Sequence, residues 1–190
     1  MLAAIKTIQR AGIEVMGGFI VGFDNDKPDI FQRQIRFVQE AGVVTAMIGL
    51  LTALPGTRLF SRLKHEGRIL QDATGNNMDG VLNFVPKLDR EVLVEGYRSL
   101  VKHLYAPKAY YRRILTFLHE YRPAGPKFYF NWRDIVAFLK SLWIIGLWTP
   151  GRREYWKFLI KTLLFHRQAF SEAMALAIYG YHYRRIACTL

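Results

Sequence analysis

The sequence of 190 residues predicts an α/β unit followed by an all-α unit, and three observations lead to that fold class. In the first part of the chain, helical patterns alternate with short runs of β-branched and aromatic residues. In the second part, only helical patterns occur. The charge divides in the same way, because residues 1–95 balance eleven basic against eleven acidic side chains, whereas residues 96–190 carry sixteen basic against four acidic ones. We therefore expect two units, residues 1–88 and 89–190, of which the second faces something anionic.

The first unit is predicted to run helix, strand, helix, strand, helix. The predicted elements are an amphipathic helix over residues 1–12, a buried strand over 13–21, a helix from Ile30 that stops at Gly42, a buried strand over 43–51, and a helix capped by Thr57 that ends at Gly67. This order is typical of parallel βα units, because parallel neighbours need a crossover helix between them. Two such strands cannot close a barrel and would leave both sheet edges open. We therefore expect further strands before Met1.

The second unit is predicted to contain helices and loops only. Before it, a loop over residues 68–88 ends the first unit. The first predicted helix is capped by Asp89 and runs to about Leu104, and the second runs from Pro107 to about Tyr121. Gly125-Pro126 then interrupts the helical pattern. A third helix is capped by Asn131 and ends before Pro150, and two more cover residues 152–165 and 169–185.

Glycines mark the first strand, in the run Gly17-Gly18-Phe19-Ile20-Val21-Gly22-Phe23-Asp24. This run resembles the fifth-strand signature of radical S-adenosylmethionine (radical SAM) barrels. The segment GLLTALPGTRL over residues 49–59, with Glu66-Gly67-Arg68 after it, resembles the sixth strand and helix of the cobalamin-binding branch. Pro107, Tyr110, Tyr111 and Arg112 are similar to the helical C-terminal domain of uncharacterised function in that branch, which includes relatives of the hopanoid methylase.

The resemblance implies an incomplete radical SAM (β/α) barrel, consisting of its last βα units, followed by that helical domain. It implies methyl transfer or a related radical reaction on an unactivated carbon, on a substrate such as a lipid or isoprenoid. The cofactors of the parent enzyme would be S-adenosylmethionine, a 4Fe–4S cluster and cobalamin. The chain alone is expected to be inactive, because its only cysteine is Cys188 and neither the CxxxCxxC cluster motif nor the cobalamin-binding DxHxxG element is present. An N-terminal half encoded upstream is therefore an expected partner.

The candidate site residues follow from the same resemblance. In the family a GxIxGxxE pattern lines the adenine of S-adenosylmethionine, and its matching positions here are Gly18, Ile20 and Gly22. The acidic position falls on Asn25, which departs from the pattern and is flanked by Asp24 and Asp26. Leu50, Thr52 and Leu54 are candidates from the second strand, since ligands gather at the carboxyl ends of parallel strands. A glycine-rich strand is also typical of an ordinary buried strand at a crowded point. No nucleophile, general base or metal ligand is predicted.

The basic half is rich in aromatic residues, and two interpretations of it remain open. Trp132, Trp143, Trp148 and Trp156 stand among apolar runs and cations, which is the composition of helices lying in a membrane interface. The same aromatic residues could instead form the core of a helical bundle with a solvated basic face. The first interpretation allows a different function, that of a non-enzymatic helical module on an anionic membrane surface or a partner protein. Nucleic acid is disfavoured, because no recognition motif accompanies the charge.

The predicted location is the cytoplasm, with peripheral attachment to the inner face of the membrane under the first interpretation. The N-terminus carries an amphipathic helix rather than a basic stretch and an unbroken apolar run, so no export signal is predicted.

Overall fold

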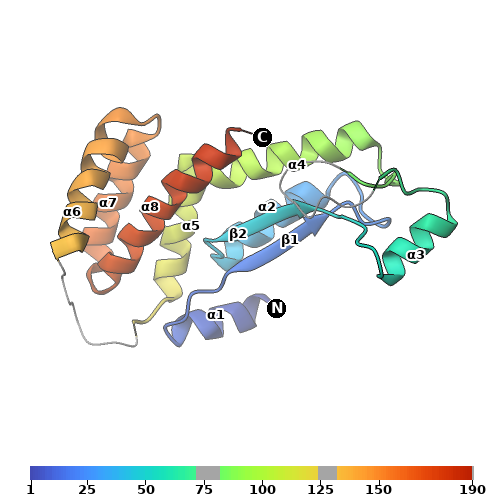
Figure 1. Cartoon of the computed structure of the whole chain (residues 1–190). Coiled ribbons are helices and arrows are strands. Elements are labelled where there is room, and N and C mark those ends of the chain that lie inside the picture. Colours follow the sequence, from blue (N-terminus) through green and yellow to red (C-terminus); the bar gives the residue numbers. More distant parts are fainter. Residues whose placement is uncertain (72–81, 124–131, 190) are drawn as a thin grey trace.

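The computed structural model of the chain describes residues 1–71, 82–123 and 132–189 (Figure 1). Within these residues it contains two strands and eight α-helices. Their bounds are α1 Leu2–Arg10, β1 Gly17–Val21, α2 Ile30–Ala41, β2 Ala46–Leu50, α3 Arg58–His65, α4 Arg90–Tyr105, α5 Pro107–Glu120, α6 Trp132–Trp143, α7 Arg152–Phe165 and α8 Phe170–Ala187, with a π-helix η1 at Ile144–Trp148 and a 3-10 helix η2 at Arg167–Ala169.

The two strands pair in parallel, as the helix–strand order predicts. Helix α2 makes the crossover between them and ends at Gly42, whose left-handed backbone (φ 63°) turns the chain back toward β2. The register places Gly18 beside Met47 and Ile20 beside Gly49. Within the described residues the sheet has these two strands only, so both of its edges are unpaired there.

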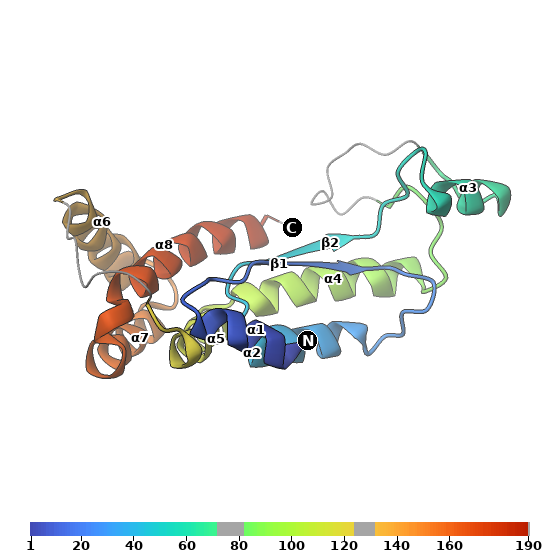
Figure 2. The same ribbon diagram turned by 90° about the horizontal axis from the view of Figure 1, so that it is seen from below.

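Helices cover one face of this sheet. Figure 2 shows α2 and α4 on the same side of the strands, and Val21, Ile48 and Leu50 are buried there. Side chains alternate between the faces of a strand. On the opposite face, Ile20 is 48% and Met47 is 59% exposed. The prediction of two buried strands is therefore wrong for this second face, because the described residues leave much of it open.

One hydrophobic core continues from the sheet into the helices of the second half. Helices α4 and α5 pack on α2, α7 packs on α5, and α8 packs on both α4 and α5. The hydroxyl of Tyr105 on α4 donates to the carbonyl of Ala46 at the start of β2, over 2.6 Å. The core thus crosses the predicted boundary between residues 88 and 89.

The predicted helix starts are confirmed where the structure describes them. The Thr57 hydroxyl accepts from the Phe60 N–H at 3.1 Å, and the Asp89 carboxylate accepts from the N–H groups of Glu91 and Val92. The helix predicted to end before Pro150 does end there, at Trp148, and its last part changes from α-helix to π-helix at Ile144–Trp148. The predicted cap Asn131 and the predicted break at Gly125-Pro126 lie outside the described residues.

Candidate functional site

The candidate site combines the open sheet face with the turn that follows β1. Gly22 starts this turn with φ 108°, a value that side chains rarely allow, and a methyl group there would lie 3.3 Å from Leu93 on α4. The carboxylate of Asp26 accepts from the N–H groups of Gly22 and Phe23 at 2.8 and 3.0 Å. These two bonds fold the chain back immediately after the strand.

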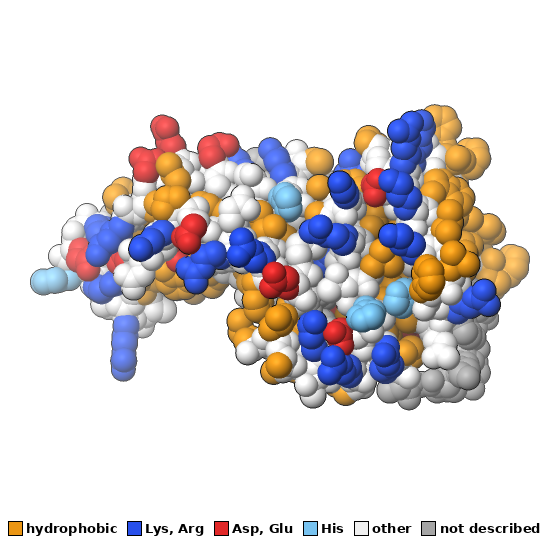
Figure 3. Space-filling view, turned by 180° about the vertical axis from the view of Figure 1, so that it is seen from behind, with side chains coloured by type: hydrophobic (Ala, Val, Ile, Leu, Met, Phe, Trp, Pro, Cys, Tyr) orange, Lys and Arg blue, Asp and Glu red, His pale blue; other side chains and the backbone are white. Residues whose placement is uncertain are grey.

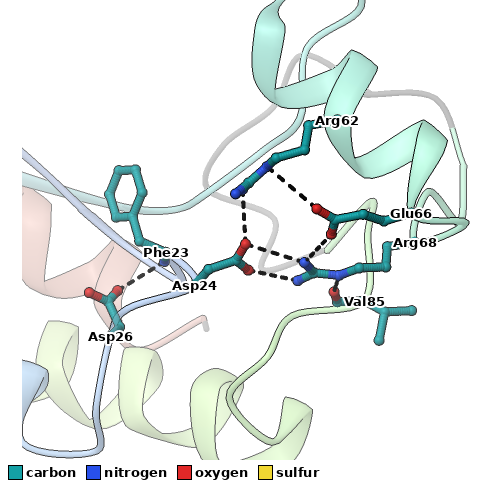
Figure 4. A network of polar contacts seen from close by, with 7 residues as sticks. All are labelled: Phe23, Asp24, Asp26, Arg62, Glu66, Arg68 and Val85. Atoms are coloured by element: carbon teal, nitrogen blue, oxygen red, sulfur yellow. Dashed lines mark hydrogen bonds and ion pairs between the residues drawn. The ribbon is translucent and has the colours of Figure 1, made fainter.

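Asp24 is the centre of an ion-pair network that ties this turn to the chain around α3 (Figure 4). Its carboxylate oxygen Oδ1 lies 2.7 Å from Arg68 Nη2, and the other oxygen, Oδ2, lies 2.9 Å from Arg62 Nη2. Arg68 also binds Glu66 at 2.8 Å and donates from Nε to the Val85 carbonyl at 2.8 Å. Since the Asp24 side chain is only 10% exposed, this network holds it in one position.

The network also fixes the charge of Asp24. The hydrogen bond from Arg68 is the largest cause that holds the pKa of Asp24 below its ordinary value, and burial opposes it. The charges of Arg68, Arg62 and Lys87 lower that pKa further. Asp24 is therefore ionised at neutral pH and positions the turn rather than supplying a proton.

Replacing Arg68 by glutamine is expected to raise the pKa of Asp24 toward its ordinary value. Because the folded-state pKa is depressed, the stability that the network contributes is present above the unfolded pKa of about 3.9 and is lost as the pH falls through the lower, folded value. NMR titration of the Asp24 carboxyl carbon, with urea unfolding across the same pH range, measures both effects. Arg98→Gln on the surface of α4 is the control, since its partner Glu95 is exposed. An unchanged Asp24 titration in Arg68→Gln would contradict the assignment.

The loop after α3 is anchored to the chain that leaves β2. The Asn83 side chain donates to the Ala53 carbonyl at 2.8 Å and accepts from the Ala53 N–H at 2.9 Å. An antiparallel bridge between Ile69 and Phe84 closes the described ends of the predicted loop. Leu51, Ala53, Leu63 and Phe84 form a small separate core there. The carboxyl ends of both strands are thus held by contacts from residues 58–69 and 82–85.

The structure brings some of the sequence-predicted site residues together and separates others. Gly18 and Ile20 lie on the open face of the sheet, and Leu54 and Asn25 are exposed beyond the strand ends. Gly22 and Leu50 are buried toward the helices, and the half-buried Thr52 donates its hydroxyl to the Leu50 carbonyl at 3.4 Å.

Met47 and Gly49 share the open face with Gly18 and Ile20, although neither was predicted from the sequence to belong to the site. Their alternation with the apolar residues Ala46, Ile48 and Leu50 is the signal that could have placed them there. A methyl group added at Gly18 would meet no atom within 4 Å. The face is therefore a shallow apolar surface with space above Gly18 in which a flat ring can lie.

The described residues contain no cluster of three or more histidine, cysteine, aspartate or glutamate side chains that could hold a metal ion. The one cysteine of the sequence, Cys188, is exposed after α8. A single cysteine cannot supply the set of thiolates that an iron–sulfur cluster requires.

Comparison with known families places the chain. Residues 57–190 match the family described as "Domain of unknown function (DUF4070)". The chain belongs to the DUF4070 family. This DUF4070 chain is also 29% identical, over 95% of its length, to an uncharacterized methyltransferase of Synechocystis sp., and 28% identical, over 86% of its length, to the hopanoid C-2 methylase of Rhodopseudomonas palustris. These matches confirm the predicted resemblance to the C-terminal part of hopanoid-methylase-like proteins.

The DUF4070 chain is shorter than its relatives. It covers 34% of the Synechocystis protein and 32% of the R. palustris protein, so it spans about a third of their length. The bacteriochlorophyllide d C-12(1)-methyltransferase of Chlorobaculum tepidum is 28% identical over 59% of the chain and 24% of its own length. No solved structure matches the DUF4070 chain.

Proposed function

We propose that this chain forms the last βα units and the helical C-terminal domain of a cobalamin-dependent radical SAM methyltransferase. The one-sided sheet carries the proposal. In a (β/α) barrel, helices cover the outer face of the parallel strands, and the other face points to the interior. Two strands with helices α2 and α4 on one side and an open face on the other have the arrangement of two neighbouring units of such a barrel.

Within that enzyme, the open face would contribute to the wall on which the adenine of S-adenosylmethionine lies. Gly18 and Gly49 let a ring approach the backbone, and Ile20 and Met47 supply apolar surface beside it. The Asp24–Arg68 pair would keep the turn after β1 in place at the rim of the site. When bound, the cofactors supply the radical and the methyl group. The thiolates that hold the cluster would come from an N-terminal partner segment, because this sequence has one cysteine.

The names of the relatives support an apolar substrate. One relative is named as a methylase of hopanoids and another as a methyltransferase of bacteriochlorophyllide d. By analogy, we propose that the whole enzyme transfers a methyl group to an unactivated carbon of a lipid or isoprenoid.

Titration of the isotope-labelled chain with S-adenosylmethionine, followed by NMR, tests the adenine surface. We expect weak binding, with shifts concentrated at the amides of Gly18, Ile20 and Met47. Gly18→Val is expected to abolish these shifts, because the valine side chain would occupy the space above the strand. The variant should fold, since that space is empty and valine favours strands.

Ser99→Val, on the exposed side of α4, is the matched control and should bind like the unchanged chain. Shifts that remain in Gly18→Val, or that map to the helices of residues 132–189, would contradict the proposed surface. The methyl-transfer step is tested separately in a chimera in which this chain replaces the matching segment of the R. palustris methylase. C-2-methylated hopanoid from the chimera, and its loss in Gly18→Val, are the expected results.

A further inference from the structure

Large apolar side chains stand exposed along α6, η1 and α7. We call the following six residues the tryptophan face: Trp132, Leu139, Trp143, Trp148, Trp156 and Ile160. Each is at least 40% exposed, and Trp132 and Trp148 reach 73% and 74%. The interpretation in which the tryptophans build a helical core is therefore wrong. The core of this region is built by other residues, such as Tyr155 and Phe158.

The exposed residues form stripes on their helices. Trp132, Leu139 and Trp143 are spaced seven and four residues apart, which places them on one side of α6. Trp156 and Ile160 are four residues apart and share one side of α7. Such stripes on surface helices normally face a core, yet here they face outward.

The π-helix joins the two stripes into one surface. The rings of Trp143 and Trp148 lie 6.3 Å apart between centroids. The indole N–H of Trp156 donates to the Gly146 carbonyl at 3.0 Å, which brings α7 against η1. The tryptophan face is thus continuous from α6 through η1 to α7.

Cations surround this face. Arg133 and Lys140 follow Trp132 and Leu139 along α6. On α7 the exposed cations are Arg152, Arg153, Lys157 and Lys161. The acidic residues of α6 and α7 are Asp134 and Glu154, and Glu154 binds Lys157 at 2.9 Å. Figure 3 shows Lys and Arg side chains beside a broad hydrophobic area at this end of the molecule.

We propose that the tryptophan face docks on an anionic lipid bilayer, with α6 and α7 lying along its surface. Tryptophan places an apolar ring and a polar N–H at a membrane interface, and flanking Lys and Arg bind anionic headgroups. Protein interfaces, in contrast, are depleted of lysine. Within the described residues, no helix combines the length and hydropathy needed to cross a bilayer. The proposal does not depend on S-adenosylmethionine binding.

Intrinsic fluorescence tests this directly, because all four tryptophans of the sequence belong to the tryptophan face. We expect vesicles of phosphatidylglycerol and phosphatidylcholine to shift the emission to the blue and to protect it from acrylamide. Pure phosphatidylcholine vesicles should do so much less. High salt should weaken the binding, since it screens the cations.

Two pairs of substitutions separate the apolar from the charged contribution. Trp143→Ser with Trp148→Ser is expected to lower the vesicle partition coefficient by roughly tenfold or more. Arg152→Gln with Arg153→Gln should lower it by roughly fivefold for each cation, on anionic vesicles only. Leu70→Ser with Val85→Ser is the matched control, since these exposed apolar residues lie outside α6–α7. Circular dichroism verifies that each variant is folded.

Three results with vesicles would overturn the proposal: an emission unchanged by anionic vesicles, equal binding to neutral and anionic vesicles, or equal loss of binding in the control pair. A duplex DNA that produced the same blue shift would overturn it as well, in favour of a nucleic-acid surface.

Discussion

Replacing Arg113 by methionine is expected to lower the free energy of unfolding by about 2–4 kcal/mol. Arg113 lies on α5 with no exposed surface. Its guanidinium donates to the carbonyls of Leu104 and Val44 at 2.9 and 3.2 Å, and it lies over the rings of Tyr105 and Tyr110. It thus connects α4, α5 and the segment that enters β2. Methionine fills the space but leaves two buried carbonyls without their donors.

An opposing effect has to be weighed against this loss. Burial lowers the pKa of Arg113 to about 10, so keeping the charge inside the protein costs free energy that methionine would recover. We expect the lost contacts to dominate. Leu104 lies in the last turn of α4, where carbonyls lack helical partners and a cation is favourable, and both tyrosine rings add to the attraction.

Urea unfolding of three variants measures the balance. Arg112→Met, at the exposed neighbouring position, should change the stability by less than about 0.5 kcal/mol. Arg113→Lys keeps the charge but loses the planar fork, and it should fall between the two methionine variants. A more stable Arg113→Met protein would mean that the cost of burying the charge exceeds the value of its contacts.

The sequence predicted most elements of the fold because their signals are local. Thr57 and Asp89 cap helices with their own side chains, and Pro107 stands in the first turn of α5. The open face of the sheet could not be predicted in the same way. Ile20 and Met47 are as apolar as core residues, and their burial depends on what covers them rather than on their own sequence pattern.

The candidate site, like the fold, could be predicted from the sequence only in part. Gly18 and Ile20 follow from the resemblance to the radical SAM strand signature. The partners of Asp24 do not, since Arg62 and Arg68 come 38 and 44 residues later in the chain. Arg113 looks like any surface arginine in a helical pattern until the packing of α5 buries it. The surroundings of the tryptophans could not be predicted either, because the residues of an apolar stripe have the same spacing whether the stripe faces a core or a membrane.

Gly180→Ala tests how closely α8 packs on α5, and it should lower the free energy of unfolding by about 1–3 kcal/mol. On an open helix this change would instead stabilise the protein by about 1 kcal/mol, because alanine has the higher helix propensity. Here the added methyl group would overlap the ring of Tyr110. The ring cannot easily move, since its hydroxyl donates to the Leu176 carbonyl at 2.8 Å and Tyr105 and Tyr111 lie against it.

Thermal unfolding of matched variants isolates the clash from the propensity. Ala175→Gly, at an exposed position of α8, should cost about 1 kcal/mol, the ordinary price of glycine in a helix. Tyr110→Ala alone should be strongly destabilising, because it removes a buried ring and its hydrogen bond. In the Tyr110→Ala background, however, Gly180→Ala should become stabilising, since the obstacle is gone and the propensity remains. If Gly180→Ala stabilises the unchanged protein too, α8 does not lie against Tyr110 as the structure places it.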